Sequence, residues 1–186
     1  SEMLMESLRY FSGQGAPSLI FNADDDSYID GLPQLGWSDP MAVDEYCATC
    51  ANVILSFTSN DFDGDDNALT SGVTGLSSAV TATASLAATE GISGSYLVGN
   101  NGVVGDGECN AQTVNASALG SANGQCDENP NHEGGWQMAG LAYHAATTDL
   151  RNDRELEQTV KTYAVDAATD RPTYVVPTSA GISNRL

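Results

Sequence analysis

Residues 51–66 read ANVILSFTSNDFDGDD and join an apolar run to an acidic one. The apolar run, Ala51 to Phe57, is short, contains β-branched residues and is bounded by polar ones. Such a run predicts a strand that is buried on both faces, as in a parallel sheet covered by helices. Open α/β sheets bind ligands beyond the carboxyl ends of their strands. We therefore expect a core strand that leads directly into a ligand site.

Four carboxylates follow this strand closely, at Asp61, Asp63, Asp65 and Asp66. Carboxylates this close repel one another unless a cation lies between them, and Ca²⁺ prefers such oxygen ligands. We interpret the four as ligands of Ca²⁺ or Mg²⁺. An EF-hand loop would have Gly at its sixth position and Glu at its twelfth, where this sequence has Asp66 and Gly72, so we expect modest affinity. The alternative interpretation is a solvated acidic turn.

The charge balance is strongly acidic, with 25 Asp and Glu residues, six Lys and Arg residues and a net charge of −19 over 186 residues. Nucleic acids and anionic membranes bind basic surfaces, so neither is expected as a partner. The balance favours divalent cations, a saline medium, or a secreted surface protein that repulsion keeps soluble. No stretch approaches the roughly 20 apolar residues of a membrane-spanning helix, so we expect no membrane insertion.

The four cysteines are Cys47, Cys50, Cys109 and Cys126. An even count in an acidic, lysine-poor chain favours disulfides and an oxidising compartment. We expect Cys109 to be bonded to Cys126, which would pin the Gly/Asn/Ser-rich loop between them. Two alternatives remain for the first pair: a thioredoxin-like redox pair, or a zinc site with the distant pair. A redox pair should follow a strand and open a helix, whereas this pair precedes a strand.

Periodicity predicts the other elements: helices over 1–11, 75–91 and 136–147, and strands over 94–98, 159–165 and 174–176. This order is typical of a parallel α/β sheet, so the strands over 51–57 and 159–165 should be parallel and close neighbours. We expect one domain over 1–186, with a disulfide-pinned insertion over about 67–135. The acidic stretch over 22–30 is either a second calcium loop or a solvated surface loop.

The histidines give no catalytic constellation. His132 and Glu133 lack the second histidine of a zinc protease helix, and no serine lies in a Gly-x-Ser-x-Gly turn. A lone helical histidine such as His144 more often lies at the surface or caps the helix than takes part in catalysis. We therefore predict that the chain is not an enzyme and keep a metal-dependent hydrolase only as the third hypothesis.

Two stretches carry a family resemblance. Residues 47–66 have a cysteine before an apolar strand that ends in an Asp/Gly-rich turn, and residues 140–165 run from a helix through Thr-Asp-Leu-Arg into the strand TVKTYAV. Both resemble the von Willebrand A-like domain of type IV pilus tip adhesins, the PilY/PilC family. Residues 1–11 are similar to the helix that follows the second metal-binding turn of that domain.

The resemblance implies a von Willebrand A-like (Rossmann-like) α/β fold with a mostly parallel sheet flanked by helices. It also implies a calcium-binding, pilus-associated domain at the cell surface that acts in attachment, pilus assembly or surface sensing. Expected partners are pilus subunits, neighbouring copies, and a host or abiotic surface ligand. In the family an Asp-x-Ser-x-Ser turn, a Thr and an Asp hold the metal. Here Ser1 lies where the Thr would be, Asp61 matches the last Asp, and the first turn would precede Ser1.

A von Willebrand A sheet without its first strand would have an open central edge, which is a template for another strand. We therefore expect the chain, as a processed or truncated piece, to accept a strand from a neighbouring copy, a partner or an upstream segment. The second hypothesis follows from this: a structural subunit of an extracellular filament that assembles by strand exchange.

Overall fold

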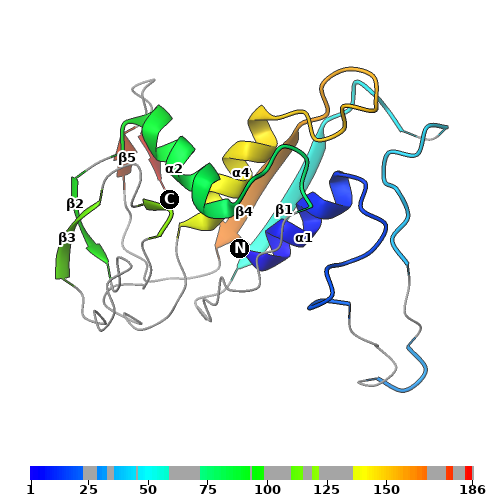
Figure 1. Cartoon of the computed structure of the whole chain (residues 1–186), viewed down its shortest axis with the longest axis horizontal. Coiled ribbons are helices and arrows are strands. Elements are labelled where there is room, and N and C mark those ends of the chain that lie inside the picture. Colours follow the sequence, from blue (N-terminus) through cyan, green and yellow to red (C-terminus); the bar gives the residue numbers. More distant parts are fainter. Residues whose placement is uncertain are drawn as a thin grey trace.

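The computed structural model describes residues 1–22, 29–32, 36–44, 46–58, 72–92, 94–98, 110–114, 119–121, 136–166, 175–177 and 183–185. The helices of this part are α1 (Glu2–Phe11), α2 (Ala79–Glu90) and α4 (Gln137–Thr147). The strands are β1 (Asn52–Thr58), β2 (Gly94–Val98), β3 (Asn110–Val114), β4 (Val160–Asp166), β5 (Val175–Pro177) and β6 (Ser183–Arg185). Figure 1 shows their arrangement. The predicted helices and strands are confirmed to within a few residues.

The central pair of strands is parallel, as predicted. β1 and β4 pair in a continuous register that runs from Asn52 opposite Val160 to Thr58 opposite Asp166. The other described strands form two small antiparallel pairs, β2 with β3 and β5 with β6. The fold is therefore α/β, and the parallel sheet of the described residues has two strands. The single-domain organisation with an insertion over 67–135 stays a prediction.

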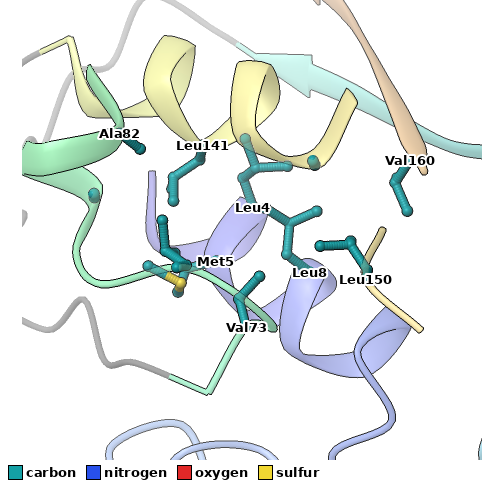
Figure 2. Packing of buried hydrophobic residues seen from close by; sticks show 11 residues of the cluster. Leu4, Met5, Leu8, Val73, Ala82, Leu141, Leu150 and Val160 are labelled. Atoms are coloured by element: carbon teal, nitrogen blue, oxygen red, sulfur yellow. The ribbon is translucent and has the colours of Figure 1, made fainter. Parts of the chain in front are cut away.

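One hydrophobic core joins α1, α4 and the start of β4. Leu4, Met5 and Leu8 form the apolar side of α1 and are buried against Leu141 of α4. Leu150 and Val160 complete the cluster, and Figure 2 shows these side chains converging between the helices and the strand. Ile54 of β1 packs against the same cluster. The core therefore covers the face of the β1–β4 ribbon that carries Ile54 and Val160, which we call the inner face.

The opposite face of the ribbon is not covered by any helix or strand among the described residues. The side chains of this outer face are Val53, Leu55 and Phe57 of β1 and Lys161, Tyr163 and Val165 of β4. The apolar ones are 47%, 55%, 69%, 55% and 44% exposed in chain order. The prediction that the first strand is buried on both faces is therefore wrong for this chain, because α1 and α4 both pack on the inner face.

A close crossing of α2 and α4 fixes the position of these two helices. α2 begins with Ser78, whose side chain accepts a hydrogen bond from the backbone of Thr81, and ends at Gly91 in the left-handed conformation. A Cβ atom at Gly140 of α4 would collide with the backbone and the hydroxyl of Thr83, which is fully buried on α2. The absence of a side chain at Gly140 therefore lets the two helices touch.

We predict that Gly140→Ala destabilises the protein by about 1–3 kcal/mol, because the added methyl group overpacks the α2–α4 contact. Helix propensity alone would favour the substitution by about 1 kcal/mol, so the sign of the effect separates packing from propensity. Chemical denaturation measures the difference. Gly15→Ala is the control, since nothing lies within 4 Å of a Cβ atom there. A Gly140→Ala variant as stable as the wild type would contradict this account.

Candidate functional site

The carboxyl edge of the β1–β4 ribbon is where the acidic segment begins. Because the strands are parallel and in register, Thr58 and Asp166 end them at the same edge. Asp61, Asp63, Asp65 and Asp66 follow Thr58 but lie outside the described residues, so their proposed metal site stays a prediction. Within the described ranges, no three His, Cys, Asp or Glu side chains form a group that could hold a metal ion.

The far end of the acidic segment is held against α1. The amide of Gln14 donates a hydrogen bond to the carbonyl of Gly72 at 2.9 Å, and the backbone of Thr74 donates one to the hydroxyl of Ser12 at 3.3 Å. Gly72 has a φ of 135° and lies so close to the Arg9 guanidinium that a Cβ atom would collide with it. The two residues that flank the undescribed segment over 59–71 are therefore placed: Thr58 lies at the sheet edge, and Gly72 lies beside the Arg9 guanidinium.

The largest charged cluster of the described residues centres on Arg151, whose side chain is only 4% exposed. Its guanidinium donates to both carboxylate oxygens of Asp39, at 2.6 and 2.9 Å, and to both oxygens of Asp153, at 2.9 and 3.1 Å. Arg154 donates to the same two carboxylates, at 2.9 and 2.8 Å, and to the carbonyl of Met41 at 2.7 Å. Two arginines and two aspartates thus form a closed network that ties the loop over 36–44 to the turn after α4.

The network stabilises the ionised form of both carboxylates. Hydrogen bonds from Arg151 hold the pKa of Asp39 far below its usual range, and the same guanidinium lowers the pKa of Asp153. The two carboxylates in turn raise the pKa of Arg151. These groups remain charged and mutually neutralised at neutral pH, so the cluster orders a loop and offers no proton donor or acceptor for catalysis.

The Thr-Asp-Leu-Arg stretch at 148–151 is a structural junction. The Asp149 carboxylate accepts hydrogen bonds from the backbone of Arg151 and of Gln158, at 3.1 and 3.0 Å. Leu150 is fully buried in the core. The buried Gln158 amide donates to the carbonyls of Ala48 and Glu155, at 3.1 and 2.8 Å. Each residue of the motif therefore holds the chain in place.

His144 is engaged through both ring nitrogens. Its Nε2 lies 2.9 Å from the carbonyl oxygen of Thr74, and its Nδ1 lies 3.3 Å from the hydroxyl of Thr148. These contacts connect α4 to the segment that returns from the acidic loop. His132 lies outside the described residues. His144 is partly buried and bridges two segments, whereas the sequence predicts a surface or capping position.

Cys47 and Cys50 form a disulfide immediately before β1. This finding confirms a disulfide at the first pair. It excludes the alternative of a zinc site shared with the distant cysteines, because the ligands of such a site are free thiolates. Cys109 and Cys126 lie outside the described residues, so their bond stays a prediction. Sequence reasoning missed the part played by Asp39, since nothing local marks a partner more than a hundred residues from Arg151.

We predict that Asp39→Asn destabilises the protein by about 1–3 kcal/mol, because it removes a charge that the buried Arg151 needs. Arg151→Lys should be destabilising too, since an ammonium group cannot donate to both carboxylates in the same forked geometry. Amide hydrogen exchange should accelerate across 36–44. Asp44→Asn, an exposed aspartate in the same loop, is the matched control. Equal exchange in the Asp39 and Asp44 variants would contradict the assignment.

The network should also give stability a recognisable pH dependence. Since the pKa values of Asp39 and Asp153 are lower in the folded state, the unfolded chain takes up protons first on acidification. The contribution of the network is therefore complete above about pH 4 and is lost progressively below it. Protonation also relieves repulsion among the other carboxylates, so the quantity to measure is the stability difference between wild type and Asp39→Asn. A difference that stays constant from pH 7 to pH 2 would refute the prediction.

Comparison with protein families matches most of this chain. A family model described as PilY1 homolog, second domain, matches residues 1–145, most of the chain. No curated protein and no solved structure matches. The match covers α1, β1, α2 and most of α4, together with Asp39 of the charged network. The Thr-Asp-Leu-Arg stretch lies just beyond it. The chain therefore belongs to the family of PilY1 homologs, in the part described as their second domain.

Proposed function

We propose that this chain is a calcium-binding domain at the cell surface that serves adhesion, assembly or surface sensing by a type IV pilus. The family itself indicates a function associated with type IV pili and with the cell surface. Among the residues the structure describes, no helix is both long enough and apolar enough to cross a membrane. Pilus subunits, and a host or abiotic surface, are the partners that this proposal assigns.

The observation that supports the calcium part of the proposal is the position of Thr58, which precedes the acidic segment in the sequence. Thr58 lies at the carboxyl edge of a parallel strand pair, the edge at which α/β sheets bind ligands. Four carboxylates supply hard oxygen ligands of the type that Ca²⁺ and Mg²⁺ take. The contacts of Gln14 and Ser12 hold the return point of the segment. Fixed ends reduce the conformational entropy that cation binding has to overcome.

The same geometry supports a von Willebrand A-like arrangement and a role in binding without catalysis. β1 and β4 are parallel, and the chain reaches β4 through α4, which packs on the ribbon. His144 has both ring nitrogens engaged in structural contacts. The proposed function therefore depends on surfaces and a cation, not on a nucleophile or a general base.

We predict that Ca²⁺ raises the stability of the chain and that Asp61→Asn/Asp63→Asn abolishes the effect. At a calcium concentration about a hundred times the dissociation constant, the free energy of unfolding should increase by about 2.7 kcal/mol. Thermal melts with calcium and with chelator measure this. The matched control is Asp25→Asn/Asp26→Asn in the other acidic stretch. If only the Asp25/Asp26 variant lost the stabilisation by calcium, the calcium site would be assigned to residues 22–30 instead.

A second candidate function is a filament subunit that assembles by strand exchange. It is favoured by one observation: among the described residues, β1 and β4 pair only with each other, so each has one edge without a partner. Unpaired strand edges template the addition of another strand. If the donor is the next copy, head-to-tail contacts that do not close would produce a fibre.

If the chain self-assembles by strand exchange, we predict that sedimentation will show species larger than the monomer whose amount increases with protein concentration. Calcium should increase this amount further if the donated strand brings oxygen ligands close to Asp61. The measurement compares calcium with chelator over a tenfold or larger range of protein concentration. A folded monomer under both conditions would rule out the filament-subunit hypothesis. The proposal of a pilus-associated domain would be unaffected.

A further inference from the structure

Leu156, in the turn between α4 and β4, has a backbone conformation that its residue type disfavours. Its φ is 61°, and among the residues that the structure describes it is the only non-glycine with a positive φ. Glycine adopts this conformation freely, whereas a residue with a Cβ atom is strained there. Burial offers no compensation, because the Leu156 side chain is 63% exposed. A strained residue that neither the backbone nor the core requires points to a function in binding.

Hydrogen bonds on both sides of Leu156 impose this conformation. The backbone of Gln158 donates to the Asp149 carboxylate at 3.0 Å, and the side chain of Gln158 donates to the carbonyl of Glu155 at 2.8 Å. The backbone of Glu155 donates to the hydroxyl of Tyr46 at 2.9 Å. The Leu156 side chain is therefore presented to solvent from a fixed turn. A residue held in this way loses little conformational entropy when a partner binds it.

A second exposed apolar side chain belongs to a segment that is joined to this turn. Val43 is 71% exposed. On one side of it, the carbonyl of Met41 accepts a hydrogen bond from Arg154 at 2.7 Å. On the other side, the ring of Tyr46 lies 5.9 Å from the guanidinium carbon of Arg154. Arg154 therefore fixes the segment that carries Val43 to the turn that carries Leu156.

Carboxylates accompany both apolar side chains. Leu156 is flanked in the sequence by Glu155 and Glu157, Val43 is followed by Asp44, and all three carboxylates are exposed. The arginines of the turn are already paired with aspartates. A partner that accepts the apolar side chains therefore needs Lys or Arg around its apolar pocket. A second copy of this chain does not fit, because two chains of charge −19 repel each other.

These residues lie near the starts of β1 and β4, at the end of the ribbon opposite to its carboxyl edge (Figure 1). The proposed calcium site is at the carboxyl edge, so the two sites can be tested separately. We call this group the amino-edge surface, and its members are Val43, Asp44, Glu155, Leu156 and Glu157.

We propose that the amino-edge surface is the docking site for a pilus subunit, and that Leu156 is the anchor that enters an apolar pocket rimmed by Lys or Arg. The choice of a pilus subunit rests on the proposed function. The identity of the anchor and the charge of the pocket come from the amino-edge surface itself.

The first measurement asks whether Leu156 serves the fold. Leu156→Gly should leave the melting temperature of the chain unchanged or raise it, because glycine adopts a positive φ without strain and no core contact is lost. Leu150→Ala is the matched control: this leucine of the same turn is fully buried, and its truncation should lower the melting temperature by several degrees. A lower melting temperature for Leu156→Gly would show that Leu156 packs within the protein, and would overturn the inference.

The second measurement is co-sedimentation of the chain with purified type IV pili from the bacterium that produces it. Leu156→Gly should weaken binding at least tenfold, as expected when a buried leucine side chain is removed from a contact. Glu155→Lys/Glu157→Lys should also weaken binding at least tenfold, because the new cations repel the basic rim of the pocket. Leu19→Ser, which changes a leucine that is 92% exposed outside the amino-edge surface, should bind as the wild type does.

The possible failures are distinguishable. If wild type and Leu156→Gly bind the pili equally, the inference is overturned and the proposed function is unaffected. Tighter binding by the Glu155→Lys/Glu157→Lys variant would show that the partner surface is acidic, which would also overturn the inference. Absence of binding by the wild type would overturn both the inference and the pilus part of the proposed function.

Discussion

Burial of the Arg151 guanidinium is the constraint on which the position of the loop over 36–44 depends. A buried cation is costly unless its donors are satisfied, and here Asp39 and Asp153 satisfy them from two directions. The loop over 36–44 has no strand or helix of its own, so its position is set mainly by this network and by the contact of Arg154 with Met41. Ion pairs therefore fix the position of this loop, whereas apolar packing fixes the positions of the helices.

The same region connects the network to the sheet. Asp149 accepts backbone hydrogen bonds on either side of the turn, and Gln158 reaches back toward the disulfide-bonded Cys47 and Cys50 through the carbonyl of Ala48. Asn52 at the start of β1 donates to the side chain of Gln158 at 3.3 Å. The turn after α4 therefore aligns the beginnings of both parallel strands. That alignment sets the position of their carboxyl ends, where the acidic segment begins.

The helices and the parallel pairing of β1 with β4 could be predicted from the sequence, because each rests on a local pattern, whereas β3, β6 and the antiparallel pairs they form were not predicted. The apolar run after Ala51 and the β-branched run after Thr159 have the length and composition of core strands. The exposure of Leu55 and Phe57 could not be predicted, since a run that suits burial on both faces does not reveal whether both covers are present. The Asp39–Arg151 contact was equally hidden, because it joins positions far apart in the chain. For the acidic segment, the sequence supplies the ligand chemistry and the structure supplies only the fixed ends.

The pairing of β1 with β4 also has a consequence for how the protein folds. Asn52 pairs with Val160, so the β1–β4 sheet cannot form until the chain has been synthesised through β4. Contacts of such long sequence separation slow folding, and the apolar strand β1 stays without its partner in the meantime. The large negative charge carried by the rest of the chain then acts as protection during biogenesis, since repulsion between nascent copies opposes aggregation through β1. The acidic composition thus opposes aggregation of the unfolded chain as well as of the folded protein.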